Sequence, residues 1–252
     1  AASDAWTEHL SQPAFKRWWL TPAFVLGRGV VYLLLWTGLA WLSLRPRWQR
    51  SGGFAAVALM LYSLSVTLAA VDWLMSLMPR WYSAGFGFVV IAGQGLAGLA
   101  AGVLAGGAAA PAKARRDLGS LLFACLLTWA YLAFVQFQII WAGDLPNEIA
   151  WYLPRLGDWR WLALALVLPG FFLPLFVLLF RGVKQAPTAL RAIAAGLLVL
   201  HALQVAWLVL PSLPQARDGL GALWIAPLAA AGITALCLAA AGSLRAEPRH
   251  GG

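Results

Sequence analysis

The stretch Ala70–Tyr82 reads AVDWLMSLMPRWY and closes a long apolar run that begins near residue 53. Asp72 is the only acidic residue inside any apolar run of the chain. A charged side chain at the middle of a bilayer costs about 3 kcal/mol on insertion scales. If the run crosses a membrane, Asp72 therefore requires either a partner there or a task that needs a titratable group.

The composition is that of an integral membrane protein. The chain has 252 residues, of which 62% are hydrophobic and 11% charged, and several apolar runs exceed the ~20 residues that cross a bilayer as a helix. The net charge of +9 would suit a nucleic-acid binder, but most cations lie in short patches between apolar runs, where cytoplasmic loops collect Lys and Arg. We therefore expect an all-α, polytopic helical bundle in lipid, with no nucleic-acid partner.

Hydropathy predicts about seven transmembrane helices, at residues 22–44, 53–78, 82–108, 118–142, 159–180, 189–211 and 221–244. They form a transmembrane bundle over residues 21–244. Pro169, Gly170 and Pro174 should interrupt the fifth span. Residues 1–20 mix aromatic and basic side chains, which favours an interfacial segment, with a disordered tail as the alternative. Residues 245–252 form a short tail.

The basic residues are distributed unevenly between the two sides of the predicted bundle. The richer side carries Arg45, Arg47, Arg50, Lys113, Arg115, Arg116, Arg181, Lys184, Arg191, Arg245 and Arg249, and the poorer side carries Lys16, Arg17, Arg80, Arg155, Arg160 and Arg217. The positive-inside rule then places the C-terminus in the cytoplasm and loop 143–158 outside. This loop, rich in Trp, Tyr and Pro, can form a folded cap or a docking surface, although an interfacial aromatic belt explains its aromatics equally well.

Cysteine and histidine provide no recognisable ligand set for a metal or a haem. Cys125 and Cys237 lie inside apolar runs without a CxxC or CxxCH context. His9 and His250 lie near the ends, which leaves His201 as the histidine of a span, too few for a bis-histidine haem. We expect no covalently bound cofactor, and any redox group should belong to another subunit.

Polar side chains inside the predicted spans gather in their outer halves. They are Arg28, Asp72, Gln94, Gln136, Gln138, His201 and Gln204. Ser65, Asp72 and Ser76 share one helical stripe, which can hold a water chain to the outside. The set suits a quinol head group and its protons, or a proton path alone, because His and buried carboxyls can titrate near neutral pH. The alternative is that Asp72 forms a structural ion pair with Arg28 or Arg80 and that His201 is a core histidine.

Small residues recur on one face of the third span. Gly98, Gly102 and Gly106 follow one another every four residues and align with Gln94. This spacing predicts the close approach of another helix. Gln94 should then face protein and find a polar partner.

Three segments together resemble the F subunit of bacterial alternative complex III, a quinol:cytochrome c oxidoreductase, and its NrfD-like, polysulfide-reductase-type relatives. They are Lys16–Arg28 (KRWWLTPAFVLGR), Asp72–Gly87 (DWLMSLMPRWYSAGFG) and Phe134–Arg155 (FVQFQIIWAGDLPNEIAWYLPR). Within them Met78 and Arg80 stand where the family has an acid and a histidine, and Ala142, Asp144 and Asn147 replace Tyr, Asn and Glu. The missing acid and histidine weaken any proton relay that would depend on them.

The resemblance implies a cofactor-free membrane subunit of a respiratory quinol-oxidising complex in a bacterial inner membrane, with loop 143–158 on the periplasmic side. Such a subunit would contribute to quinol binding or to an outward-facing proton half-channel. It implies partners that carry haem c and iron–sulfur groups, an NrfD-like quinol-binding subunit, a terminal oxidase and lipid. In the family the motifs follow several earlier spans, so the chain corresponds to the C-terminal majority of such a protein or to a short form. The family positions carried over, besides those above, are Trp73, Trp81, Tyr82, Trp141, Pro146, Glu148 and Arg155. A structural scaffold that docks redox subunits is the competing interpretation, and an independent secondary transporter ranks last.

Overall fold

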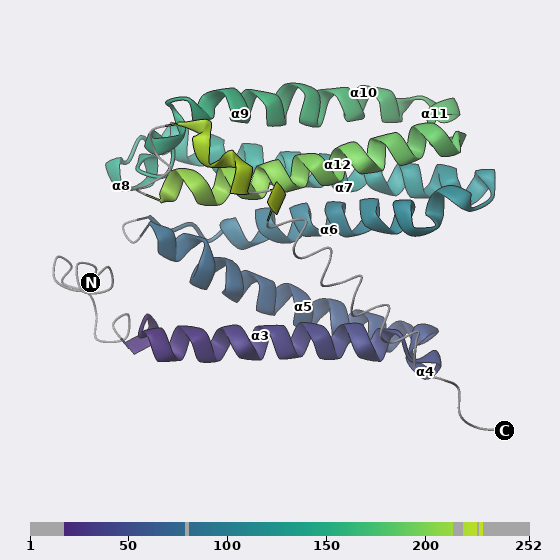
Figure 1. The fold of residues 1–252 in the computed structure, drawn as a ribbon, viewed down its shortest axis with the longest axis horizontal. Helices are drawn as coiled ribbons and strands as arrows, with labels where there is room; N and C mark the ends of the chain where they lie inside the picture. The colour runs from purple at the N-terminus through teal and green to yellow at the C-terminus, as the bar shows by residue number, and fades with distance from the viewer. Residues whose placement is uncertain (1–17, 79–80, 214–218, 226, 229–252) are drawn as a thin grey trace. The chain divides into compact units, whose positions relative to one another are not determined.

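A computed structural model describes residues 18–78, 81–213, 219–225 and 227–228. All regular secondary structure in these ranges is helical, as predicted (Figure 1). The chain divides into two units, residues 1–96 with 125–151, and residues 97–124 with 152–252. Two of the three boundaries fall inside the long helices α6 (Phe86–Ala105) and α7 (Ala112–Gly143), and the third lies between residues 151 and 152.

Six helices in the described ranges are long and apolar enough to cross a membrane, so the protein is an all-α, multi-pass membrane protein. They are α3 (Pro22–Ser43), α5 (Gly52–Trp73) with η1 (Met75–Leu77), α6 (Phe86–Ala105), α7 (Ala112–Gly143), α9 (Trp159–Val167) continued by η4 (Leu168–Phe172) and α10 (Leu173–Leu179), and α12 (Pro187–Val209) with η5 (Leu210–Ser212).

These six helices match the first six predicted spans, with the fourth beginning earlier because its charged first turns are helical. The predicted seventh span and the tail lie mostly outside the described residues, as does most of segment 1–20.

Short helices join the long ones. They are α4 (Pro46–Gln49), η2 (Gly107–Ala109), α8 (Pro146–Ile149), η3 (Leu153–Arg155), α11 (Arg181–Gln185) and η7 (Leu220–Trp224). Proline stands in the first turn of α3 and α12, where its missing N–H leaves no intrahelical bond unmade. Ser51 caps α5 by accepting a hydrogen bond from the backbone N–H of Phe54 at 3.2 Å.

The fifth span is interrupted where the sequence predicts it. Leu168–Phe172 is a π-helical segment between α9 and α10, and Pro169 in it has no N–H to give to the regular ladder. At Gly170 an added Cβ would lie 3.0 Å from Leu200 Cδ2 and 3.2 Å from the Ala165 carbonyl oxygen. The glycine therefore permits close contact between this break and α12.

The close approach of another helix that the sequence predicts along the third span is not found among the described residues. An added Cβ at Gly98, Gly102 or Gly106 would meet no atom of the described residues within 4 Å. A tight contact lies instead at the start of α6, where a Cβ on Gly87 would stand 2.6 Å from Thr67 Cγ2 of α5. Regular spacing of small residues permits a contact, but it does not supply the partner.

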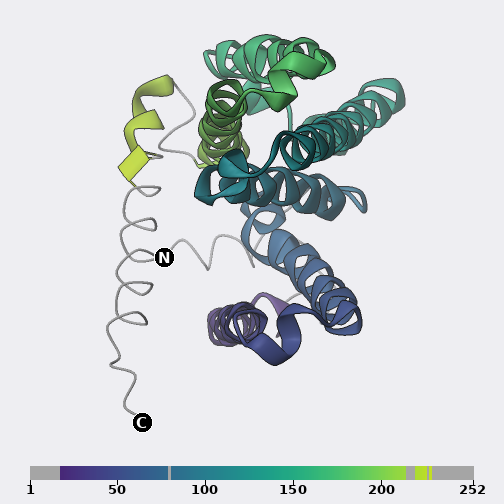
Figure 2. The same ribbon diagram turned by 90° about the vertical axis from the view of Figure 1, so that its right-hand side faces the viewer.

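Each unit has its own interior. In the first unit α3 packs against α5 (Figure 1; Figure 2). In the second unit α9 packs against the last turns of α12. The core cluster of that unit comprises Trp159, Leu162, Leu166, Ala206 and Leu210.

Candidate functional site

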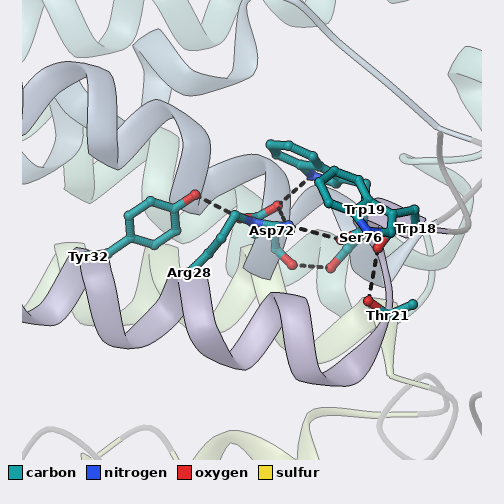
Figure 3. A network of polar contacts seen from close by, with 7 residues as sticks. All are labelled: Trp18, Trp19, Thr21, Arg28, Tyr32, Asp72 and Ser76. Atoms are coloured by element: carbon teal, nitrogen blue, oxygen red, sulfur yellow. Dashed lines mark hydrogen bonds and ion pairs between the residues drawn. The ribbon is translucent and has the colours of Figure 1, made fainter.

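Asp72, in the last turn of α5, binds directly to Arg28 of α3 in the first unit (Figure 3). Arg28 Nε donates to Oδ2 and Arg28 Nη2 donates to Oδ1, both at 2.8 Å. This two-point geometry matches the planar guanidinium to the carboxylate. The ion pair that the sequence left open as the alternative for Asp72 is therefore present, with Arg28 as the partner.

Two further donors reach the same carboxylate. The Tyr32 hydroxyl donates to Oδ2 at 2.8 Å, and Trp19 Nε1 donates to Oδ1 at 3.1 Å. Tyr32 lies one turn after Arg28, which puts both side chains on the same face of α3. Four donors therefore converge on the two oxygens of Asp72.

Arg28 is itself held by Trp19, which precedes α3, and by Phe24 in the first turn of α3. Its Nη1 donates to the Trp19 carbonyl oxygen at 3.0 Å, and its guanidinium carbon lies 4.0 Å from the Trp19 ring centroid and 4.5 Å from that of Phe24. Asp72 is 4% exposed. The two charges thus offset each other in a nearly enclosed aromatic setting, which lowers the cost of placing either one in a span.

The predicted serine stripe divides into local contacts. Ser76 donates to the backbone oxygen of Asp72 at 2.5 Å, and not to its carboxylate. Ser65 is buried, donates to the Tyr62 carbonyl at 2.9 Å and accepts from Trp36 Nε1 at 2.9 Å. These hydroxyls are therefore engaged with neighbouring groups of the helices and do not form a direct protein chain leading to Asp72.

Gln94 has the protein partner that the sequence predicted. The Tyr62 hydroxyl donates to Gln94 Oε1 at 2.7 Å. An aromatic cluster of Tyr32, Trp36, Tyr62 and Trp73, with ring centroids 5.8 to 6.2 Å apart, joins this contact to the Asp72 cluster. The hydrogen-bonded groups around Asp72 and the Tyr62–Gln94 contact are therefore connected by packed aromatic rings.

A second aromatic cluster joins two other parts of the first unit. The rings of Trp81 and Trp151 are stacked with centroids 4.3 Å apart, and Phe86 packs edge-on against both. All three side chains are buried. Trp81 and Trp151 come from different sequence segments. The stack therefore attaches Trp151 of loop 143–158 to Trp81, which precedes α6, and to Phe86, with which α6 begins.

Gln136 lies on α7 in the first unit and is half-buried. Among the described residues, no group forms a hydrogen bond with its buried Oε1. The same holds for Trp129 Nε1, seven residues earlier on the same face of α7. One buried acceptor and one buried donor on this face therefore have no hydrogen-bond partner among the described residues.

His201 and Gln204 belong to the second unit. Gln204 is buried in α12, and His201 is partly buried and contacts the Gln204 side chain on the same helix. Because the two units are separate bodies here, the predicted gathering of His201 with Asp72 stays a prediction.

Arg155, in η3, closes the end of α12 in the second unit. It is 2% exposed and donates to the carbonyl oxygens of Trp207 at 3.2 Å and Leu208 at 2.7 Å, and to Ser212 Oγ at 2.9 Å. Cations suit the last carbonyls of a helix. Burial lowers the pKa of Arg155 to about 9, against a smaller opposing effect of Tyr152, whose own pKa burial raises to about 12.

The remaining positions that carry the resemblance lie closer to the surface. Tyr82 is 72% and Trp141 71% exposed. Glu148 is half-buried in the first turn of α8, which begins at Pro146. Asp144 follows α7 with φ 47°, a left-handed conformation that Asp and Asn tolerate better than most residues.

Sequence reasoning missed several members of the site. Tyr32, Trp36 and Tyr62 lie in spans and were not singled out, although Tyr32 stands four residues after Arg28, the spacing of one helix face. Trp19 lies in the first segment that carries the resemblance, but the sequence did not predict its contact with Asp72. The capping role of Arg155 had a weaker signal, because its carbonyl partners lie more than fifty residues away.

Comparison with known proteins adds no assignment, since no protein-family model matches the chain and no curated protein matches it. In the described part of the chain no three His, Cys, Asp or Glu side chains are grouped so that they could hold a metal ion. The class of protein is therefore defined by the fold alone, as a multi-pass helical membrane protein with a paired Asp–Arg site between two of its spans.

Proposed function

We propose that this chain is a membrane subunit, without a redox centre of its own, of a respiratory quinol:cytochrome c or quinol:acceptor oxidoreductase. The observation that carries the proposal is a direct contact between resembling segments. Trp19 and Arg28 of the first segment bind Asp72 of the second. The Trp81–Trp151 stack joins the second segment to the third. Residues that carry the resemblance thus form contacts with one another in one unit.

In this proposal the quinol contact lies on α7. Gln136 Oε1 is the type of acceptor that a quinol hydroxyl needs, and Trp129 Nε1 the type of donor that a quinone oxygen needs. Asp72 is less suited to receive protons in the paired state, because four donors already occupy its oxygens. A half-channel through Asp72 would require the Arg28 pair to open.

The test is the composition of the native assembly. A tagged full chain, purified in mild detergent from its own membranes, should bring down subunits with haem c and iron–sulfur groups, and the preparation should oxidise quinol with cytochrome c. Isolation of the chain as a lone oligomer would contradict the proposal. Gln136→Leu should then raise the KM for quinol while the complex still assembles, with Tyr131→Phe as an exposed control on the same helix.

The second candidate is a structural scaffold, and the saturated Asp72 carboxylate favours it. The double variant Arg28→Gln, Asp72→Asn removes both charges together and leaves no unpaired ion in the span. If the complex assembles and both turnover and proton release are retained, the pair is structural. If the complex assembles and proton release is lost, the half-channel role is supported. A secondary transporter has less support, because paired broken helices are typical of that class and, in the described part, the fifth span alone contains a π-helical break.

We further propose a bacterial inner membrane location with the C-terminus in the cytoplasm. Cysteines introduced one at a time at Ser51 and Gly157, in a chain lacking Cys125 and Cys237, test this orientation. In intact cells a membrane-impermeant maleimide should label the cysteine at 157 and not that at 51. The reverse pattern would invert the topology.

A further inference from the structure

Six cations gather at one end of the second unit. They are Lys113, Arg115 and Arg116 in the first turns of α7, Arg181 and Lys184 in α11, and Arg191 in α12. These parts of α7, α11 and α12 lie at the same end of the unit (Figure 1). We call this the α7–α11 basic face.

The face is held together by specific contacts and is not only a charged loop. Arg115 Nε donates to the Gln185 carbonyl oxygen at 2.6 Å, and its Nη1 donates to that of Ala110. Lys184 Nζ donates to Ser120 Oγ at 3.3 Å and lies 5.2 Å from the Phe123 ring centroid. Two of the cations are thereby fixed at the contact of α7 with α11.

Gly119 permits this fixed arrangement. A Cβ there would stand 2.9 Å from Lys184 Cγ and 3.0 Å from Lys184 Cβ. The lysine stem therefore passes directly over the backbone of α7. Its position follows from packing as well as from charge.

The positive charge of the face is poorly neutralised by the protein. Asp117 is the only acid in residues 112–124 and 181–191, and its nearest oxygen is 3.9 Å from Arg116 Nε. Arg181, Lys113 and Arg191 are exposed. Among the described residues, the remaining five cations of the face form no ion pair with a carboxylate. An anion from outside the chain could therefore neutralise the positive charge of the α7–α11 basic face.

Apolar side chains lie directly beside these cations. Leu121, Leu179 and Phe180 are all more than half exposed, and Phe180 immediately precedes Arg181. In a membrane protein such side chains contact acyl chains, so the cations stand at the depth of the head groups. A cationic rim above an exposed apolar surface fits a ligand with an anionic head and hydrocarbon tails.

We propose that the α7–α11 basic face binds the phosphate of an anionic phospholipid in the adjoining leaflet, with Lys184, Arg181 and Arg116 as its main contacts. Arg and Lys both bind phosphate oxygens through charge-assisted hydrogen bonds. This binding does not depend on the quinol role proposed above. It assigns a structural lipid to the second unit.

The test uses the full chain in neutral detergent, titrated with phosphatidylglycerol or phosphatidylcholine and observed by native mass spectrometry. The wild-type chain should retain phosphatidylglycerol at least about tenfold more tightly than phosphatidylcholine. Each cation removed should weaken that binding by about fivefold, the effect of one basic residue near an anionic surface. Arg181→Gln with Lys184→Gln should therefore lose most of the preference.

The matched control is the basic loop between α3 and α5, which we expect on the same side of the membrane as the α7–α11 basic face. Arg45→Gln with Arg47→Gln removes two cations there, each of which lies over a tryptophan ring. If the retained lipid sits on the α7–α11 basic face, this double variant should change phosphatidylglycerol binding by less than about twofold. If Lys184→Gln impairs folding, Arg181→Gln with Arg191→Gln changes only exposed side chains and should still weaken binding. Equal losses in both loops, no preference over phosphatidylcholine, or full displacement by inorganic phosphate would overturn the proposal.

Discussion

Arg28 and Asp72, 44 residues apart in the chain, bind each other through two hydrogen bonds of 2.8 Å between α3 and α5. Removing one partner from such a buried pair leaves an unpaired charge and costs about 3–5 kcal/mol. We therefore expect Asp72→Asn alone to lower the thermal unfolding midpoint strongly. The double variant Arg28→Gln, Asp72→Asn should be less destabilised than this single variant. Scanning fluorescence in detergent measures both.

The control for this pair is Arg160, which is exposed and lies 5.1 Å from the Trp161 ring centroid. Arg160→Gln should change stability by less than about 0.5 kcal/mol. Equal destabilisation by Asp72→Asn and by the double variant would show that the two charges do not depend on each other.

The Tyr32 hydroxyl should contribute measurably to the same site. It donates to Asp72 Oδ2 at 2.8 Å and is buried, and a hydrogen bond to a charged group contributes about 1.5–3 kcal/mol. Tyr32→Phe should lower stability by that amount in a chemical unfolding titration. Tyr82→Phe, the same change at an exposed ring, should have no measurable effect. A Tyr32→Phe protein as stable as the wild type would remove Tyr32 from the site.

The Trp81–Trp151 stack should be a principal source of stability for the first unit. Truncating a buried tryptophan costs about 3–5 kcal/mol because it leaves a cavity. Trp151→Ala should therefore destabilise the protein far more than Trp141→Ala, whose ring is exposed in the same sequence segment. Thermal unfolding and protease resistance of residues 143–151 both report the change. If Trp151→Ala and Trp141→Ala lower stability by similar amounts, the Trp81–Trp151 stack is not a principal source of stability.

Two glycines of α6 should respond differently to substitution by alanine. At Gly87 a Cβ would lie 2.6 Å from Thr67 Cγ2 and 3.2 Å from Thr67 Cβ, so Gly87→Ala should cost about 1–3 kcal/mol. At Gly98 nothing lies within 4 Å, so Gly98→Ala should be neutral or stabilising by up to about 1 kcal/mol. Thr67→Ala should rescue Gly87→Ala in the double variant. Absence of rescue would place the clash elsewhere.

The fold could be predicted far more fully than the site. Apolar length alone located six spans, because each helix satisfies its own backbone hydrogen bonds in lipid, and Pro169 marked the break in the fifth. The partner of Asp72 depended on the register between α3 and α5, which periodicity cannot supply, so Arg28 remained one of two options. Gly98, Gly102 and Gly106 show the same limit. Their spacing indicates that another helix could approach this face of α6, but it does not indicate whether one does.

Arg155 gives a pH dependence with a definite sign. Burial lowers its pKa to about 9 in the folded protein, below its ordinary value of 12.5. Below pH 9 both folded and unfolded chains carry the proton, so the contribution of Arg155 to stability is constant. Between pH 9 and 12.5 the unfolded chain binds more protons than the folded one, and stability from this group rises with pH.

We therefore compare the wild type with Arg155→Gln, which lacks this titration but keeps every other group. At pH 7.5 the variant should be less stable by about 2–3 kcal/mol, because carbonyl oxygens at the end of α12 lose a charged donor. The difference in unfolding free energy should stay constant up to about pH 8.5 and widen between about pH 9 and 11. Tyr152, with its pKa at about 12, stays mostly neutral in this window. A difference that narrows above pH 9 would mean that Arg155 keeps its proton more tightly in the folded protein than in the unfolded chain.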